Sequence, residues 1–195
     1  DIALRLDANG LVGAVNGADL LDPEVDDVTL GGTINLRLNT MPQAASLDVN
    51  GTVVMVPAAQ VGNFFVRVEV VAATLGVLGN EFTADRLAFE SDGANVSLEG
   101  ENVGLRFAAD PAGVDVRILA ISSADLGFVF SAGGVAGFVA NALVQGPDLP
   151  DIDLAGTVSV LVNTTGVAAT FDNAGTAVAV PAGTGTGFVR VVVTD

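Results

Sequence analysis

The sequence predicts an all-β chain: an elongated antiparallel β-repeat, built as a sandwich or a flattened solenoid, with essentially no α-helix. Three observations lead to this prediction. Apolar residues alternate with polar or small ones, which is the period of a strand with one buried face. β-Branched residues are frequent, and they pack better on a pleated sheet than in a helix. Turn sequences such as Asn-Gly separate the alternating segments at short intervals.

The expected strands follow one another along the chain. The first has Ile2, Leu4 and Leu6 on one face. Later segments show the same alternation at Ile34/Leu36/Leu38, Val66/Val68/Val70, Leu87/Phe89, Val103/Leu105/Phe107, Val114/Val116/Ile118, Leu126/Phe128/Phe130 and Val158/Val160/Val162. We expect short strands, roughly ten to twelve per 124 residues, which is the length of the unit that the chain repeats.

The turns favour antiparallel pairing. Asn50-Gly51 lies between residues 45–49 and 52–56, and Asn-Gly tolerates the positive φ angles of a two-residue type I′ hairpin. Its counterpart later in the chain is Ala174-Gly175. The alternative all-β architecture is a parallel β-helix, in which about six coils of about twenty residues would fill one unit.

The chain repeats itself at an offset of 124 residues. Over residues 1–58, 22 of the 58 pairs are identical, and a one-residue deletion then moves the offset to 123. We therefore divide the chain into a first unit, 1–124, and a partial second copy, 125–195, equivalent to 1–72. The second copy stops before the unit is complete, so we expect a length of a longer array or a subunit that awaits its complement.

The composition excludes several kinds of chemistry. The chain has no cysteine, histidine, tryptophan, tyrosine or lysine, which rules out disulfides, thiolate metal sites, Schiff bases and triads that need histidine or cysteine. We expect no enzymatic activity, and a glycosidase that uses carboxylates alone is a remote alternative. The net charge of −16 argues against nucleic acid as a partner, and no apolar run is long enough for insertion into a membrane.

Acidic loops are the candidate metal site. A carboxylate is retained at two equivalent positions, Glu24 with Asp148 and Asp27 with Asp151. Oxygen donors on a turn are what Ca²⁺ requires, so Ca²⁺ is the cofactor that the sequence suggests. Ordinary polar turns are the alternative, because the spacing of a calcium loop is absent.

Most arginines occupy the strand face opposite the apolar one, where they can pair with Glu69, Glu90 or Asp115. These arginines are Arg5, Arg37, Arg67, Arg106, Arg117 and Arg190. Arg67 and Arg190 recur with the same neighbours, which predicts a contact between units. A solvated outer face is the alternative explanation.

Three stretches, residues 32–40, 65–68 and 75–90, resemble tandem repeats of very large secreted or surface proteins of bacteria. The resemblance implies an extended, adhesin-like or fibre-like protein and no catalytic residues. We therefore expect a structural module of an extracellular filament, stalk or sheath at the cell surface, whose partners are copies of itself joined head to tail through strand edges. The alternative is a calcium-dependent adhesin that binds a cell-surface glycan.

Overall fold

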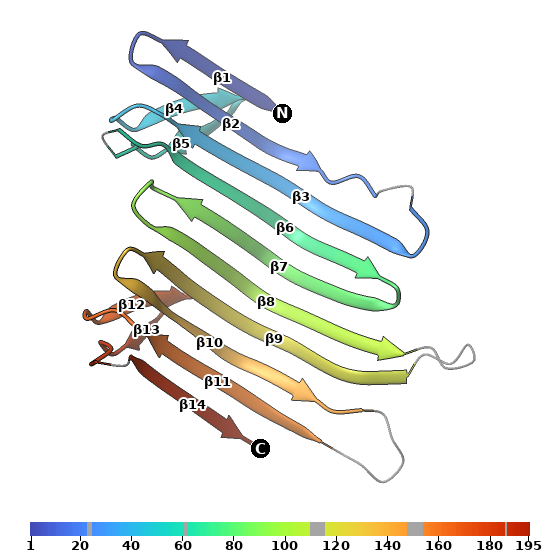
Figure 1. Ribbon diagram of the computed structural model, residues 1–195. Helices are drawn as coiled ribbons and strands as arrows, with labels where there is room; N and C mark the ends of the chain where they lie inside the picture. Colours follow the sequence, from blue (N-terminus) through green and yellow to red (C-terminus); the bar gives the residue numbers. More distant parts are fainter. Residues whose placement is uncertain (23–24, 61, 110–115, 148–153, 186) are drawn as a thin grey trace.

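The computed structural model describes residues 1–195 except 23–24, 61, 110–115, 148–153 and 186 (Figure 1). The described residues form β-strands joined by turns and contain no helix. The strands are β1 (Ile2–Asp7), β2 (Gly10–Asp19), β3 (Val28–Asn39), β4 (Ala45–Val49), β5 (Thr52–Val56), β6 (Phe65–Val77), β7 (Asn80–Ser91), β8 (Val96–Ala109), β9 (Val116–Ser131), β10 (Gly134–Gln145), β11 (Ala155–Asn163), β12 (Ala169–Asn173), β13 (Thr176–Val180) and β14 (Phe188–Thr194). The prediction of an all-β chain is confirmed.

Ten of these strands form one open antiparallel sheet, in the order β1-β2-β3-β6-β7-β8-β9-β10-β11-β14. Each strand pairs with the next one available along the chain, so the sheet is a long meander (Figure 1). All pairings between described strands are antiparallel. The parallel β-helix, which was the alternative architecture, is therefore wrong.

The four remaining strands form two small hairpins, β4–β5 and β12–β13, which lie against the sheet. The first packs on β1, β2 and β3, and the second on β9, β10 and β11. The turn predicted at Asn50-Gly51 is confirmed, because Val49 pairs with Thr52 and both turn residues have positive φ angles, 51° and 83°. Ala174 and Gly175 adopt the same conformation in the second hairpin, at 48° and 82°.

Both hairpins lie on the same face of the sheet, which we call the hairpin face. Ala14 packs under the first hairpin. Residues paired directly across strands share a face, and the pairing leads from Ala14 through Arg37, Arg67, Glu90, Ser97 and Val129 to Ala136. Ala136 is next but one to Phe138, whose ring contacts Phe171 of the second hairpin, so both residues point to the same side.

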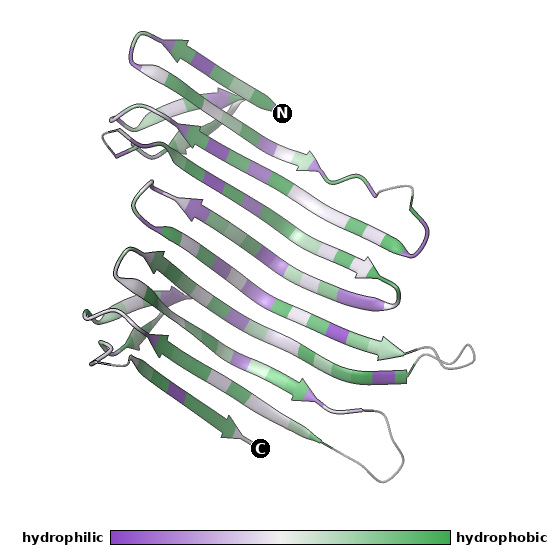
Figure 2. Ribbon diagram, in the orientation of Figure 1, coloured by the Kyte–Doolittle hydropathy of each residue, from purple (hydrophilic) through white to green (hydrophobic). Residues whose placement is uncertain are grey.

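The opposite side of the sheet, the apolar face, carries the residues that alternate with these. It carries Ile2, Leu4, Leu6, Val15, Ile34, Leu36, Leu38, Val66, Val68, Val70, Leu87, Phe89, Val96, Leu98, Leu126, Phe128, Phe130, Val135, Val139, Val158, Val160, Val162, Val189, Val191 and Val193, with Gly13, Gly100 and Gly137 between them and the polar Ser91 between Val66 and Val96. Figure 2 shows the alternation of hydrophobic and hydrophilic residues along β3, β6, β7 and β8, and the almost uniformly hydrophobic β14.

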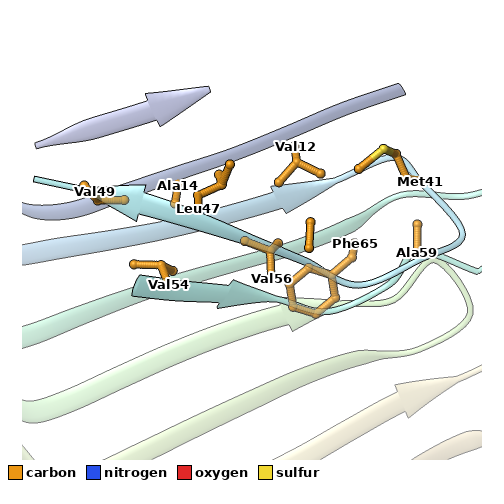
Figure 3. Close-up of a cluster of buried hydrophobic side chains, with 10 residues drawn as sticks. Val12, Ala14, Met41, Leu47, Val49, Val54, Val56, Ala59 and Phe65 are labelled. Carbon is orange, nitrogen blue, oxygen red and sulfur yellow. The ribbon is translucent and has the colours of Figure 1, made fainter. Parts of the chain in front are cut away.

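The main buried core lies between the first hairpin and the sheet (Figure 3). Val12 from β2, Val56 from β5 and Phe65 from β6 are at most 2% exposed there. Burying side chains of this size stabilises the fold by roughly 1.5–3 kcal/mol each, so the hairpin holds firmly to the sheet.

An asparagine fixes the base of each hairpin. Asn39 is fully buried; its Nδ2 donates to the carbonyls of Gln43 and Pro57, at 2.8 and 2.7 Å, and its Oδ1 accepts from the Met41 amide at 2.7 Å. Asn163 makes the equivalent bonds, with Nδ2 donating to the carbonyls of Val167 and Pro181, at 2.9 and 2.8 Å. Each side chain thus joins the two ends of the loop that carries its hairpin.

The strands of the large sheet are longer than expected, up to 16 residues in β9. β-Bulges let them continue past the point where the sequence alternation changes phase. Pairing shifts occur after Val15, Gly31, Gly100 and Val139. A second, smaller core lies close to this line of bulges and includes Ala84, Val103, Ala124 and Ala142. The expectation of ten to twelve short strands per unit is therefore wrong, because the first 124 residues contain only eight complete strands and part of β9 among the described residues.

Candidate functional site: an arginine–glutamate network between two hairpins

The most polar cluster on the hairpin face lies on β6, β7 and β8, between the two hairpins. Each strand contributes two charged side chains, Arg67 and Glu69 from β6, Arg86 and Glu90 from β7, and Glu99 and Glu101 from β8. Alternation places both members of each pair on one face, and the register sets Arg67 opposite Glu90 and Arg86 opposite Glu101.

The two arginines join the three strands through ion pairs. Arg67 binds Glu90 at 2.8 Å and reaches Glu69 and Glu99 at 3.4 Å. Arg86 binds Glu99 and Glu101 at 2.6 Å and Glu69 at 3.0 Å. Glu69 and Glu99 each contact both guanidinium groups, so the six side chains form one connected network.

Burial and hydrogen bonding act in opposite directions on the pKa values of this network. Burial alone would lower the pKa of Arg86, but the hydrogen bonds to Glu99 and Glu69 outweigh it and the pKa is raised. Burial would raise the pKa of Glu69, yet the hydrogen bonds from Arg86 and Asn35 leave it below its ordinary value. Glu69 is therefore ionised at neutral pH and is a poor proton donor.

A cavity of about 290 Å³ opens beside the network. Arg86, Glu99 and Glu101 form its polar wall, and Phe138 and Phe171 lie on the side of the second hairpin. Glu99 and Glu101 are bound to the Arg86 guanidinium group, whereas the carboxylate of Asp172, which also lines the cavity, accepts a hydrogen bond from the Gly175 amide at 2.8 Å. Among the described residues, no three acidic side chains are placed to hold a metal ion.

Three of the four predicted calcium ligands, Glu24, Asp148 and Asp151, lie outside the described residues. Asp27 is described, and it sits exposed in a turn with a φ angle of 60°. Its backbone carbonyl accepts a hydrogen bond from the Leu78 amide at 2.9 Å. Calcium binding at these loops stays a prediction.

The two arginines predicted to contact another unit have different surroundings. Arg67 pairs with Glu69, Glu90 and Glu99, which all belong to the first unit. Arg190 is exposed on the last strand, β14, and makes no ion pair with any described residue. The expected cross-strand pairing of the arginines with Glu69, Glu90 or Asp115 is confirmed for Arg67 with Glu90. Asp115 lies outside the described residues, and a contact with another unit stays a prediction for both arginines.

The sequence analysis missed Arg86, Glu99 and Glu101. Their pattern was visible, because Arg86 and Glu90 lie four residues apart on one strand and Glu99 and Glu101 lie two apart on the next. What the sequence did not show is the register that brings Arg86 opposite Glu101. The pairing across strands, rather than the alternation within them, defines the network.

The sheet has two open edges in the described part of the chain. β1 pairs only with β2, and β14 pairs only with β11. The apolar residues at these edges are well exposed, with Leu4 at 70% and Val189 at 67%. An unpaired edge of this kind presents backbone donors and acceptors to any strand that can add to it.

The described part of the chain contains no helix long and apolar enough to cross a membrane. Comparison of the chain with protein-family models, with curated proteins and with solved structures finds no match in any of the three.

Proposed function

We propose that the chain is a structural module of an extracellular filament, stalk or sheath, in which copies add head to tail through the edges of their sheets. The open ten-stranded sheet carries this proposal, because β1 and β14 each lack a second neighbour among the described strands. Strand addition at such edges is a general way to join β-proteins.

The number of strands is compatible with continuous growth. Strand direction alternates across an antiparallel meander, so in a sheet of ten strands the first and the last run in opposite directions. A second copy placed head to tail therefore brings its β1 antiparallel to β14 of the first copy. An open contact of this kind extends into a fibre unless rotation closes it into a ring.

The register of this contact is restricted, because residues on the hairpin face of one copy must lie opposite residues on the hairpin face of the next. On the hairpin face β14 carries Arg190 and Val192, whereas β1 carries Ala3, Arg5 and Asp7. We assign the register in which Arg190 lies opposite Asp7 of the next copy. This register also sets Val191 against Leu6 and Val193 against Leu4 on the apolar face.

The first unit shows a pairing that Arg190 does not make with any described residue. Its equivalent, Arg67, lies directly opposite Glu90 on the neighbouring strand and binds it at 2.8 Å. Asp7 of the next copy would supply the missing carboxylate to Arg190. The pair would select register and direction more than it would add affinity, because exposed ion pairs contribute only about 0–1 kcal/mol.

Electron microscopy and sedimentation velocity of the purified chain test the proposal. We expect filaments whose length grows with concentration. Arg190→Asp should raise the concentration needed for assembly by about tenfold, because it sets like charges opposite each other. Combining Arg190→Asp with Asp7→Arg should restore assembly, since the pair is then rebuilt with its charges exchanged.

Two results would overturn the proposal. One is a chain that stays monomeric or dimeric at high concentration. The other is assembly that Arg190→Asp weakens and the charge exchange does not restore, which would show that Arg190 acts without Asp7. Circular dichroism of each variant is the control for folding, and Arg106→Asp, on β8 and away from both edges of the sheet, is the matched change of charge.

A further inference from the structure

We infer that the apolar face is an interface for a second copy of this chain, which packs on it face to face to form a two-layer sandwich. This contact is separate from the edge contact proposed above and does not depend on it. Each layer of the sandwich is the ten-stranded sheet of one copy. The hairpins and the arginine–glutamate network lie on the two outer sides.

The apolar face crosses the whole sheet without a polar side chain in its central row. Direct pairing leads from Ile2 on β1 through Val68 on β6 and Phe128 on β9 to Val189 on β14, with one residue from each of the ten strands. All ten are aliphatic residues, phenylalanine or glycine. None of the hairpins covers this face, because both pack on the other side.

The burial of large apolar side chains differs between the two faces. On the hairpin face Val12, Phe65 and Phe138 are at most 2% exposed. On the apolar face Phe89 and Phe130 remain 43% and 41% exposed, and Ile2 reaches 70%. Large aromatic and aliphatic side chains thus stay in contact with water in an isolated copy.

The size of the face corresponds to that of a stable protein interface. Ten strands about 4.8 Å apart span about 43 Å, and three rows of outward residues extend about 20 Å along the strands, which gives about 850 Å². A single protein surface rarely leaves a continuous apolar patch larger than about 300–600 Å². Two copies packed face to face would bury about 1,700 Å² in total, which is the ordinary size of a specific interface.

The charge and shape of the chain select a second copy as the occupant. The face has no charged group to pair, so its complement is another apolar sheet face, and two such faces pack about 10 Å apart. The net charge of −16 disfavours an anionic lipid surface. Packing two copies through their apolar faces also keeps the four glutamates of each network on the outside, far from those of the partner.

Sedimentation equilibrium tests this inference with two matched substitutions. Val68→Glu places a charge at the centre of the apolar face, and Val53→Glu places the same charge on the outer side of the first hairpin, where Val53 is 68% exposed. The measurement uses the Arg190→Asp variant as background, so that growth through the edges does not mask the dimer. If the edge proposal fails, the unmodified chain serves equally well.

We expect a dimer on this background, with a dissociation constant that Val68→Glu raises by about 100-fold, because a charge would be buried against an apolar face. Val53→Glu should change the dissociation constant by less than about twofold, because an exposed residue outside the interface contributes little to dimerisation. Mixing Val68→Glu with Val68→Lys should restore mixed dimers, as the two charges would then meet between the sheets.

Three outcomes would overturn the inference. They are a monomer at about 100 μM, a dimer that folded Val68→Glu leaves intact, and equal effects of Val68→Glu and Val53→Glu. If Val68→Glu does not fold, Ile2→Glu replaces it, because Ile2 lies at the rim of the same face and its side chain is already in solvent. That variant should weaken the dimer by about tenfold, and an unchanged dissociation constant would count against the interface.

Discussion

The two copies of the repeated sequence build the same structure from largely different residues. β4 and β12, and likewise β5 and β13, begin and end at positions 124 residues apart. The identical residues include those whose side chains bind the backbone. Asn39 and Asn163 hold the bases of the hairpins, and Asp48 accepts a hydrogen bond from the turn amide at 2.6 Å, as its equivalent does at 2.8 Å.

The residues that differ between the copies are those that set packing and surface chemistry. Under the first hairpin, Ala14 lies beside Leu47 in the core. Their equivalents under the second hairpin are Phe138 and Phe171, whose rings lie 5.6 Å apart. Ala3 is replaced by Gly127, where a Cβ would come within 2.6 Å of the Phe138 ring. A change to a smaller residue on one strand therefore accommodates larger ones on its neighbours.

A hollow beside each hairpin shows the same divergence at the surface. In the first copy it measures about 330 Å³ and is lined by Arg5, Asp7 and Gln43 among others. In the second it measures about 440 Å³, and the equivalent positions are Val129, Ser131 and Val167. Hydrogen bonds to the backbone thus fix the fold, while the surface chemistry is free to change.

The strongest test of this comparison removes the asparagine from each hairpin. Asn39→Ala should lower the free energy of unfolding by about 3–4 kcal/mol, because it leaves buried carbonyls and an amide without partners. Asn163→Ala should cost a similar amount, since it breaks the equivalent bonds. Urea denaturation with a spectroscopic probe measures both.

Asn39→Asp is the control for the direction of the bonds, because it keeps the acceptor for the Met41 amide and loses the two donated bonds. It should destabilise at least as much as Asn39→Ala at neutral pH, since a carboxylate would be buried beside two carbonyls. A loss below about 1 kcal/mol for Asn39→Ala would show that the hairpin does not depend on this side chain.

The next test concerns the packing difference under the hairpins. Gly127→Ala should destabilise the chain by about 2 kcal/mol, because its methyl group would overlap the buried Phe138 ring. The rescue variant combines it with Phe138→Ala and Phe171→Leu, which rebuilds the arrangement of the first copy. If the triple variant is no more stable than Gly127→Ala alone, the three positions do not act together.

The third test moves to the network, which lies between the two hairpins and belongs to the first unit. Arg86→Met should lower the free energy of unfolding by about 1–2 kcal/mol, because Glu69, Glu99 and Glu101 lose a partner and Glu69 is partly buried. Arg5→Met is the matched control. Arg5 is 46% exposed and only approaches Asp7 at 3.8 Å, so its loss should cost less than about 0.5 kcal/mol.

The pH dependence of stability, compared between the wild type and Arg86→Met, shows whether the loss of stability comes from charge or from packing. The pKa of Glu69 is lowered in the folded chain, so its stabilising effect is present above its ordinary value of 4.5 and disappears as the pH falls through the lowered pKa. The difference in stability between the wild type and Arg86→Met should therefore shrink below pH 4.5. A difference that stays constant down to pH 3 would assign the loss to packing rather than to charge.

Local sequence patterns predicted the strands and the turn at Asn50-Gly51, because both depend on neighbours along the chain. The length of β9 and the position of Arg86 were not predicted, since they depend on bulges and on register across the sheet. Alternation also identified the apolar face. It did not show that both hairpins would cover the other side.

The smallest expected effect concerns the two hairpin turns, where Asn50 in the first copy corresponds to Ala174 in the second. Both have φ angles near 50°, which cost less for asparagine than for alanine. Ala174→Gly should therefore stabilise the chain by about 0.5–1 kcal/mol, whereas Asn50→Ala should destabilise it by a similar amount. Thermal denaturation of both variants measures the pair of shifts, which should have opposite signs. If both variants shift the melting temperature in the same direction, turn conformation does not distinguish the two copies, and the loss at Asn50 would instead reflect its hydrogen bond to Asp1.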